Sequence, residues 1–175
     1  MKNYILYILL FLLVSIGAYK LTIHATPYAV LFVVKLVGNG VLNEPVYTDV
    51  ITDKERRVVM PNPDFIYVAM GYNLYNGPVR ISGKMPEDSY ASVALYNSNT
   101  QNYFVLNDRE TPNKSFNLLL SREENTNPNK DESSQLISSP SGLGVVLMRI
   151  LVKDKDKLSY FREIQQSFKA EVVEE

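Results

Sequence analysis

The sequence has no cysteine, no tryptophan and one histidine among its 175 residues. Without cysteine the chain can form no disulfide, no thiolate nucleophile and no cysteine-ligated zinc site. His24 is the single imidazole, so histidine-rich metal sites and most histidine-dependent catalytic triads are also excluded. We therefore assign no metal, no cofactor and no catalytic residue from the sequence.

Neither sign of charge predominates, because 18 Lys and Arg stand against 19 Asp and Glu. This balance does not force the basic surface that binds a phosphate backbone, so nucleic acid is not the expected partner. Hydrophobic residues make up 46% and charged residues 21%, which excludes a disordered or fibrous chain.

One long uncharged run lies at the N-terminus, at residues 4–19 (YILYILLFLLVSIGAY), between Lys2 and Lys20. If Lys20 reaches the headgroups, residues 4–23 form about 30 Å of helix, one hydrocarbon thickness of a lipid bilayer. Residues 1–25 are therefore predicted to be a single-pass membrane anchor. A cleaved signal peptide is the alternative, although neither 15–17 nor 23–25 forms a good small-x-small cleavage site.

Lysines on the two sides of the run nearly balance, so the positive-inside rule does not fix the orientation. Because a single N-terminal anchor most often leaves the long domain translocated, we expect residues 26–175 on the outer side of the membrane.

From residue 65 onward, short segments with a period of two are separated by turn signals. The predicted strands are 65–72, 78–83, 89–96, 103–106, 115–120 and 144–152, the last buried on both faces except at Arg149. Ala91, Val93 and Leu95 share one face, so Tyr90 and Tyr96 point to the other. This spacing predicts a mainly β fold, an antiparallel sandwich or barrel.

Three further segments have other patterns. Residues 28–37 are apolar but too short for a second span, and are either a buried strand or an amphipathic stretch on the bilayer. Residues 121–134 are a polar loop. Residues 154–170 change to a helical period and are predicted to be a C-terminal helix packed on the sheet through four apolar side chains: Leu158, Phe161, Ile164 and Phe168.

Tyrosines are the most informative side chains. Tyr67, Tyr90 and Tyr96 lie on predicted strands, and aromatic sheet faces bind sugars, flat ligands or proteins. The alternative is simple sheet propensity, since tyrosine packs well on a half-buried sheet. Carboxylates are numerous, but no pair of them is accompanied by a second motif that would indicate a catalytic site. A hydrolase that uses Asp64 and Asp108 is therefore the weakest hypothesis.

Several segments carry a resemblance: PNPDFIY at 61–67, NLYNGP at 73–78, YASVALY at 90–96, NYFVLND at 102–108 and SPSGLG at 139–144. With the TPY entry at 26–28, they resemble the short, membrane-anchored members of the bacterial domain-of-unknown-function family 1254. Phe65 departs from the pattern, because longer relatives more often have threonine there. The motif positions, structural or binding, are Pro63, Asp64, Tyr67, Gly77, Pro78, Asn102, Tyr103, Asn107 and Asp108.

The resemblance implies a jelly-roll-like antiparallel sandwich in residues 26–175, and no established reaction. With the predicted anchor, we expect a bacterial cytoplasmic (inner) membrane location, with the domain in the periplasm or outside the cell. A companion protein of domain-of-unknown-function family 1214 is the implied partner. We expect a non-catalytic envelope module that assembles with a partner, or else a small-ligand or glycan binding protein that uses Tyr67, Tyr90 and Tyr96.

Overall fold

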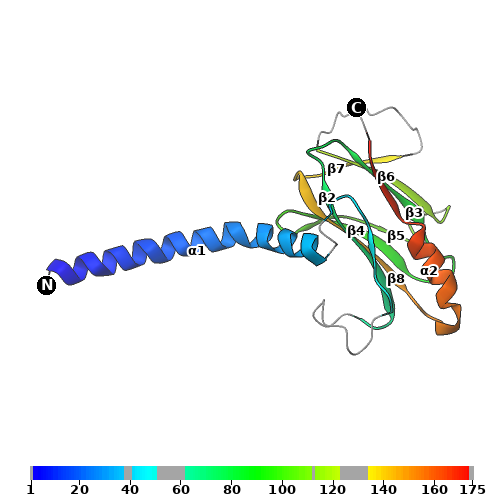
Figure 1. Cartoon of the computed structure of the whole chain (residues 1–175), viewed down its shortest axis with the longest axis horizontal. Coiled ribbons are helices and arrows are strands. Elements are labelled where there is room, and N and C mark those ends of the chain that lie inside the picture. Colours follow the sequence, from blue (N-terminus) through cyan, green and yellow to red (C-terminus); the bar gives the residue numbers. More distant parts are fainter. Residues whose placement is uncertain (1, 38–40, 51–61, 112, 123–133, 174–175) are drawn as a thin grey trace.

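A long N-terminal helix leads away from a β-rich domain (Figure 1). The computed structural model describes residues 2–37, 41–50, 62–111, 113–122 and 134–173. Helix α1 (Lys2–Val37) contains Tyr4–Thr26, a segment long and apolar enough to cross a membrane, and the protein buries none of its apolar window. The apolar helix predicted for residues 4–23 is therefore confirmed.

Helix α1 continues past residue 25, and residues 28–37 are its last part. The buried-strand alternative for residues 28–37 is therefore wrong. A continuous apolar run does not distinguish a helix from a strand. Pro27 removes one backbone hydrogen bond but does not end the helix.

Two sheets form the domain. Sheet A has the strand order β1-β2-β8-β4-β5 and sheet B the order β7-β6-β3-β9. Their bounds are β1 Val46–Tyr47, β2 Phe65–Asn73, β3 Val79–Lys84, β4 Ala91–Asn97, β5 Asn102–Asn107, β6 Ser115–Ser121, β7 Gln135–Ser138, β8 Leu143–Leu151 and β9 Lys169–Val172. The strands predicted from the period of two are all present, with ends shifted by one or two residues.

The sheets enclose one core, because alternate residues of both contribute to a single buried cluster. Sheet A contributes Ile66, Val68 and Met70 from β2 and Met148 and Ile150 from the neighbouring strand β8. Sheet B contributes Ile81 from β3 and Leu118 from β6. The mainly β fold is confirmed. Pairing is antiparallel except between β6 and β7, which are parallel, so sheet B is mixed. The strand order does not confirm a jelly roll.

The helix in the C-terminal segment is shorter than predicted. A 3₁₀ turn (Lys155–Lys157) leads into α2 (Leu158–Gln166), and β9 then pairs with β3. Phe161 and Ile164 of α2 are in the core as expected, but Phe168 is buried beyond the end of the helix. The prediction of helix to residue 170 is wrong, because α2 ends at Gln166 and the chain pairs with β3 as a strand from Lys169 onward.

Strand β8 also differs from expectation. Its side chains alternate between buried and half-buried, so the prediction of burial on both faces is wrong. The very short strands β1, β7 and β9 contain too few residues for a period to be seen. The expected polar loop lies mainly outside the described residues.

Candidate functional site

The outward side chains of sheet A are largely apolar, and we call this surface the apolar face. It consists of Phe65, Tyr67 and Ala69 on β2, Val145, Leu147 and Leu151 on β8, Ala94 and Tyr96 on β4, Val105 on β5, and Tyr90 just before β4. Most of these side chains are half-buried, Ala94 is buried, and Tyr90 and Val105 are exposed at 37% and 45%.

Cross-strand register brings these residues into rows. Ala69 of β2, Leu147 of β8 and Ala94 of β4 form one row that ends at Val105 on the edge strand β5. Directly opposed side chains in such a row lie about 5 Å apart and pack on one another. The apolar face is therefore continuous across four strands.

Strand β3 of sheet B has polar side chains on its outward side. Arg80, Ser82 and Lys84 of β3 point outward, and Arg80 makes an ion pair of 3.2 Å with Glu171 of β9. Sheets commonly have one face on the core and a polar face in solvent, and the outward side chains of β3 follow this rule. The apolar face of sheet A departs from it.

Two of the three candidate tyrosines come together. Phe65 lies between them, with ring centroids 6.1 Å from Tyr67 and 6.3 Å from Tyr90. Tyr96 lies in the row of Gly71, which is four residues, or about 13 Å, along β2 from Tyr67. Tyr90 and Tyr96 point outward as predicted, but the three rings do not line one cleft.

The two candidate hydrolase carboxylates are far apart. Asp64 lies next to the end of β8, since its carbonyl accepts a hydrogen bond from Val152, whereas Asp108 lies beside Ala91 at the start of β4. The order β2-β8-β4-β5 separates them by three strand spacings, about 14 Å. Pairs of carboxylates that cleave glycosides lie roughly 5 to 9.5 Å apart.

The motif residues at turns have structural roles. The Asn107 side chain accepts from the amide of Arg109 at 3.0 Å, and the Asp108 carboxylate accepts from the amide of Ala91 at 3.3 Å. Asn102 donates its amide to the carbonyl of Leu95 at 3.1 Å, beside the irregularity in the β4–β5 pairing. These contacts hold the strand ends together, which is the capping expected of such side chains.

The motif residues before β2 are exposed, whereas those before β3 are packed in a turn. Pro63 and Asp64 are exposed just before β2. Gly77 has a φ of 124°, which favours glycine, and a Cβ there would lie 3.0 Å from the carbonyl oxygen of Val173. Pro78 is buried, and its carbonyl accepts a hydrogen bond from the amide of Val173 at 2.8 Å. Gly77 and Pro78 thus form the turn into β3.

Tyr103 belongs to a hydrogen-bonded group inside the sandwich. The hydroxyl of the fully buried Tyr72 lies 3.2 Å from that of Tyr103 and 2.9 Å from Oγ of Ser139, and it donates to the carbonyl of Tyr96. Burial raises the pKa of Tyr103 above its ordinary value of 10.0, and its neighbour Tyr72 raises it further while Ser139 lowers it. The phenol is therefore held neutral.

The raised pKa predicts how stability depends on pH. The folded protein keeps the Tyr103 proton, whereas the unfolded chain releases it near pH 10, so stability is full below pH 10 and falls above it. The slope from this group is at most about 1.4 kcal/mol per pH unit. Urea unfolding between pH 9 and 11.5 should show a shallower fall in Tyr103→Phe than in wild type. Identical slopes would contradict this account.

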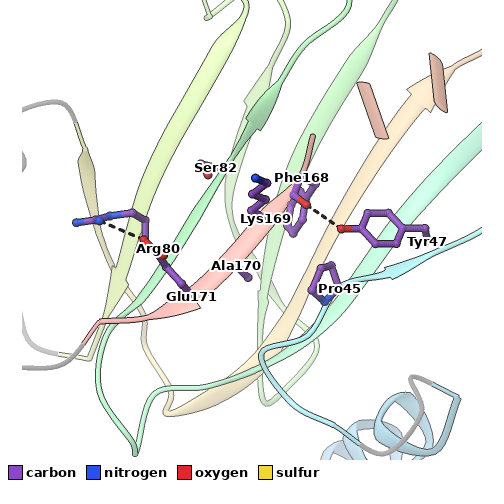
Figure 2. A pocket seen from close by; sticks show the side chains of 8 residues that line it. All are labelled: Pro45, Tyr47, Arg80, Ser82, Phe168, Lys169, Ala170 and Glu171. Atoms are coloured by element: carbon purple, nitrogen blue, oxygen red, sulfur yellow. Dashed lines mark hydrogen bonds and ion pairs between the residues drawn. The ribbon is translucent and has the colours of Figure 1, made fainter. Parts of the chain in front are cut away.

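A shallow groove of about 300 Å³ lies between the edge strands β1 and β9. Figure 2 shows Tyr47 and Pro45 on one side of it and the side chains of β9 on the other. The Tyr47 hydroxyl donates to the carbonyl of Phe168 at 2.8 Å, and Arg80 is already paired with Glu171. Two of the polar side chains that line the groove, Tyr47 and Arg80, are thus already hydrogen-bonded.

Metal ligation has no support in the described residues, where no three His, Asp or Glu side chains gather as a metal site would need. Arg149 is the feature that sequence reasoning missed. It was visible only as a charge within an apolar strand, and the structure places it on the apolar face, opposite Tyr67 and Ser92.

The comparisons with known proteins agree with this fold. The model of the family "Protein of unknown function (DUF1254)" matches residues 42–172, so the chain belongs to that family. No curated protein matches it.

Two solved structures share the fold at 13% sequence identity, and each is matched over 84% of this chain. The VPA0106 protein from Vibrio parahaemolyticus gives a TM-score of 0.66, and a putative uncharacterized protein from Burkholderia cenocepacia gives 0.54. The matched part is 34% and 40% of those chains, so this chain spans well under half the length of either.

Proposed function

We propose that this chain is a non-catalytic, membrane-tethered module that binds a partner protein through the apolar face. The apolar face itself carries the proposal. Strand β8 presents Val145, Leu147 and Leu151 outward, a composition typical of strands covered on both sides, yet these residues are only half-buried. A covering layer supplied by another protein accounts for both facts.

The shape of the face favours a protein over a small ligand. Small-molecule sites are concave and enclose most of the ligand, whereas the apolar face is the outer surface of a sheet. Protein interfaces have an apolar centre enriched in aromatic residues, as here with Phe65, Tyr67 and Tyr90. Small-ligand or glycan binding by Tyr67, Tyr90 and Tyr96 stays a prediction from sequence.

The relatives support the same view. In both solved structures this fold is a minor part of a longer chain, so in those proteins it occurs together with further polypeptide. Resemblance to short members of the family suggests a companion of domain-of-unknown-function family 1214 as the partner. The proposed site of assembly is the outer side of a bacterial inner membrane, with Tyr4–Thr26 as the uncleaved tether.

Site-specific photocrosslinking in native membranes tests the proposal. A photoreactive amino acid is placed at Val105 on the apolar face or, as matched control, at Leu136 on the outward side of sheet B. The two positions are both on edge strands and are exposed at 45% and 41%. We expect one discrete crosslinked protein from Val105 and none from Leu136. Equal yields from both positions, or none from either, would contradict the proposal.

A further inference from the structure

Arg149 is the one charged side chain among the outward strand positions of sheet A that the structure describes. It lies opposite Tyr67 on β2 and opposite Ser92 on β4, and Ser92 in turn lies opposite Asn107 on β5. Its neighbours along β8 on the same face are Leu147 and Leu151. The charge therefore lies within the apolar face, on the strand between β2 and β4.

The guanidinium of Arg149 is poorly satisfied by the described part of the chain. One Nη donates to Oγ of Ser92 at the long distance of 3.4 Å, and Nε is buried without a partner. A guanidinium carries five N–H donors, so most of them make no hydrogen bond to the described residues. Arg80 and Arg162 differ because each makes an ion pair, Arg80 with Glu171 and Arg162 with Asp49, although Nε of Arg80 is also buried without a hydrogen-bond partner.

Covering the apolar face changes the energetics of this charge. In the free protein water can solvate the exposed part of the guanidinium, but a partner that packs on Leu147 and Tyr67 removes that water. An unpaired charge in a dry interface is strongly unfavourable, so a stable complex needs an anion at this point. The apolar surroundings thus make an anionic group on the partner a requirement.

We propose that Arg149 binds a single carboxylate of the partner protein, an inference that rests on the proposed function of the apolar face. One carboxylate neutralises one guanidinium and matches its paired donors in geometry. A phosphate dianion would leave a net negative charge among apolar residues, and the described face offers no second cation for it. Tyr67, which lies opposite Arg149 on β2 and is half-buried, is the neighbouring side chain whose hydroxyl could add a polar contact.

The first test needs no partner. The full-length protein, labelled with ¹⁵N-arginine in a non-ionic detergent, is titrated with phenylacetate and with its neutral analogue phenylacetamide. The Nε–H signal assigned through Arg149→Lys should shift saturably, with affinity for phenylacetate at least about tenfold above that for phenylacetamide. The Arg80 signal is the internal control and should not move, because Glu171 already pairs with it. Equal response to both compounds, no response, or tighter binding of phenyl phosphate would overturn the inference.

The second test uses the protein crosslinked through Val105. Arg149→Gln should weaken its binding at least about 30-fold, the effect of truncating a buried charge pair. Arg149→Glu should be rescued by a Glu→Lys or Asp→Lys change in the partner. If Val105→Asp abolishes binding while Arg149→Gln leaves it unchanged, the apolar face is the interface and the carboxylate inference fails. If neither change affects binding, the proposed function fails as well.

Discussion

Gly144→Ala is expected to destabilise the domain by about 3 kcal/mol or more. A Cβ at this position would lie 2.2 Å from the carbonyl oxygen of Tyr96 and 2.3 Å from the hydroxyl of Tyr72. Contacts this short force either the β4–β8 pairing or the buried tyrosine ring to move. Movement of the ring also breaks the hydrogen bonds of Tyr72 with Tyr103 and Ser139.

Thermal unfolding followed by circular dichroism measures this effect. A loss of 3 kcal/mol corresponds to a fall in Tm of roughly 10 °C for a chain of this size. The control is Gly17→Ala, where an added Cβ meets nothing within 4 Å and the Tm of the domain should not change. A Tm for Gly144→Ala within a degree of wild type would show that the close packing of Tyr72 over Gly144 is not what holds these strands together.

Strand positions were predictable where one face is buried. In β4 the alternation of Ala91, Val93 and Leu95 fixes which residues enter the core, and the structure confirms it. The C-terminal segment was harder, because the apolar residues at 161, 164 and 168 fit a helix that in fact ends at Gln166. Whether the chain after Gln166 continues as helix or forms β9 from Lys169 onward is decided by pairing with β3, which is a tertiary effect.

The error in β8 bears directly on the candidate site. An apolar run such as residues 144–152 has the same sequence whether a second layer of the same chain or another protein covers its outer side. The sequence therefore predicted burial on both faces, and the structure leaves the outer side half-exposed. For the same reason the sequence did not show Arg149 as a site, since its surroundings depend on which strands flank β8.

Partner binding should be lost when a charge is introduced on the apolar face. Val105→Asp places a carboxylate in the row of Ala94 and Leu147, where a docked partner would bury it unpaired. Such a buried charge weakens an interface by about 100-fold or more. Because Val105 is exposed at 45% in the free protein, the substitution should change the stability of the domain by less than about 1 kcal/mol.

The most direct measurement is therefore the affinity of the partner crosslinked through Val105 for the wild-type protein, Val105→Asp and Leu136→Asp, all full-length in detergent. Leu136→Asp adds the same charge to an edge strand of sheet B at a similar exposure, 41%. We predict that Val105→Asp loses about 100-fold in affinity while Leu136→Asp retains the wild-type value. Equal affinities for the two variants would contradict binding through the apolar face of sheet A.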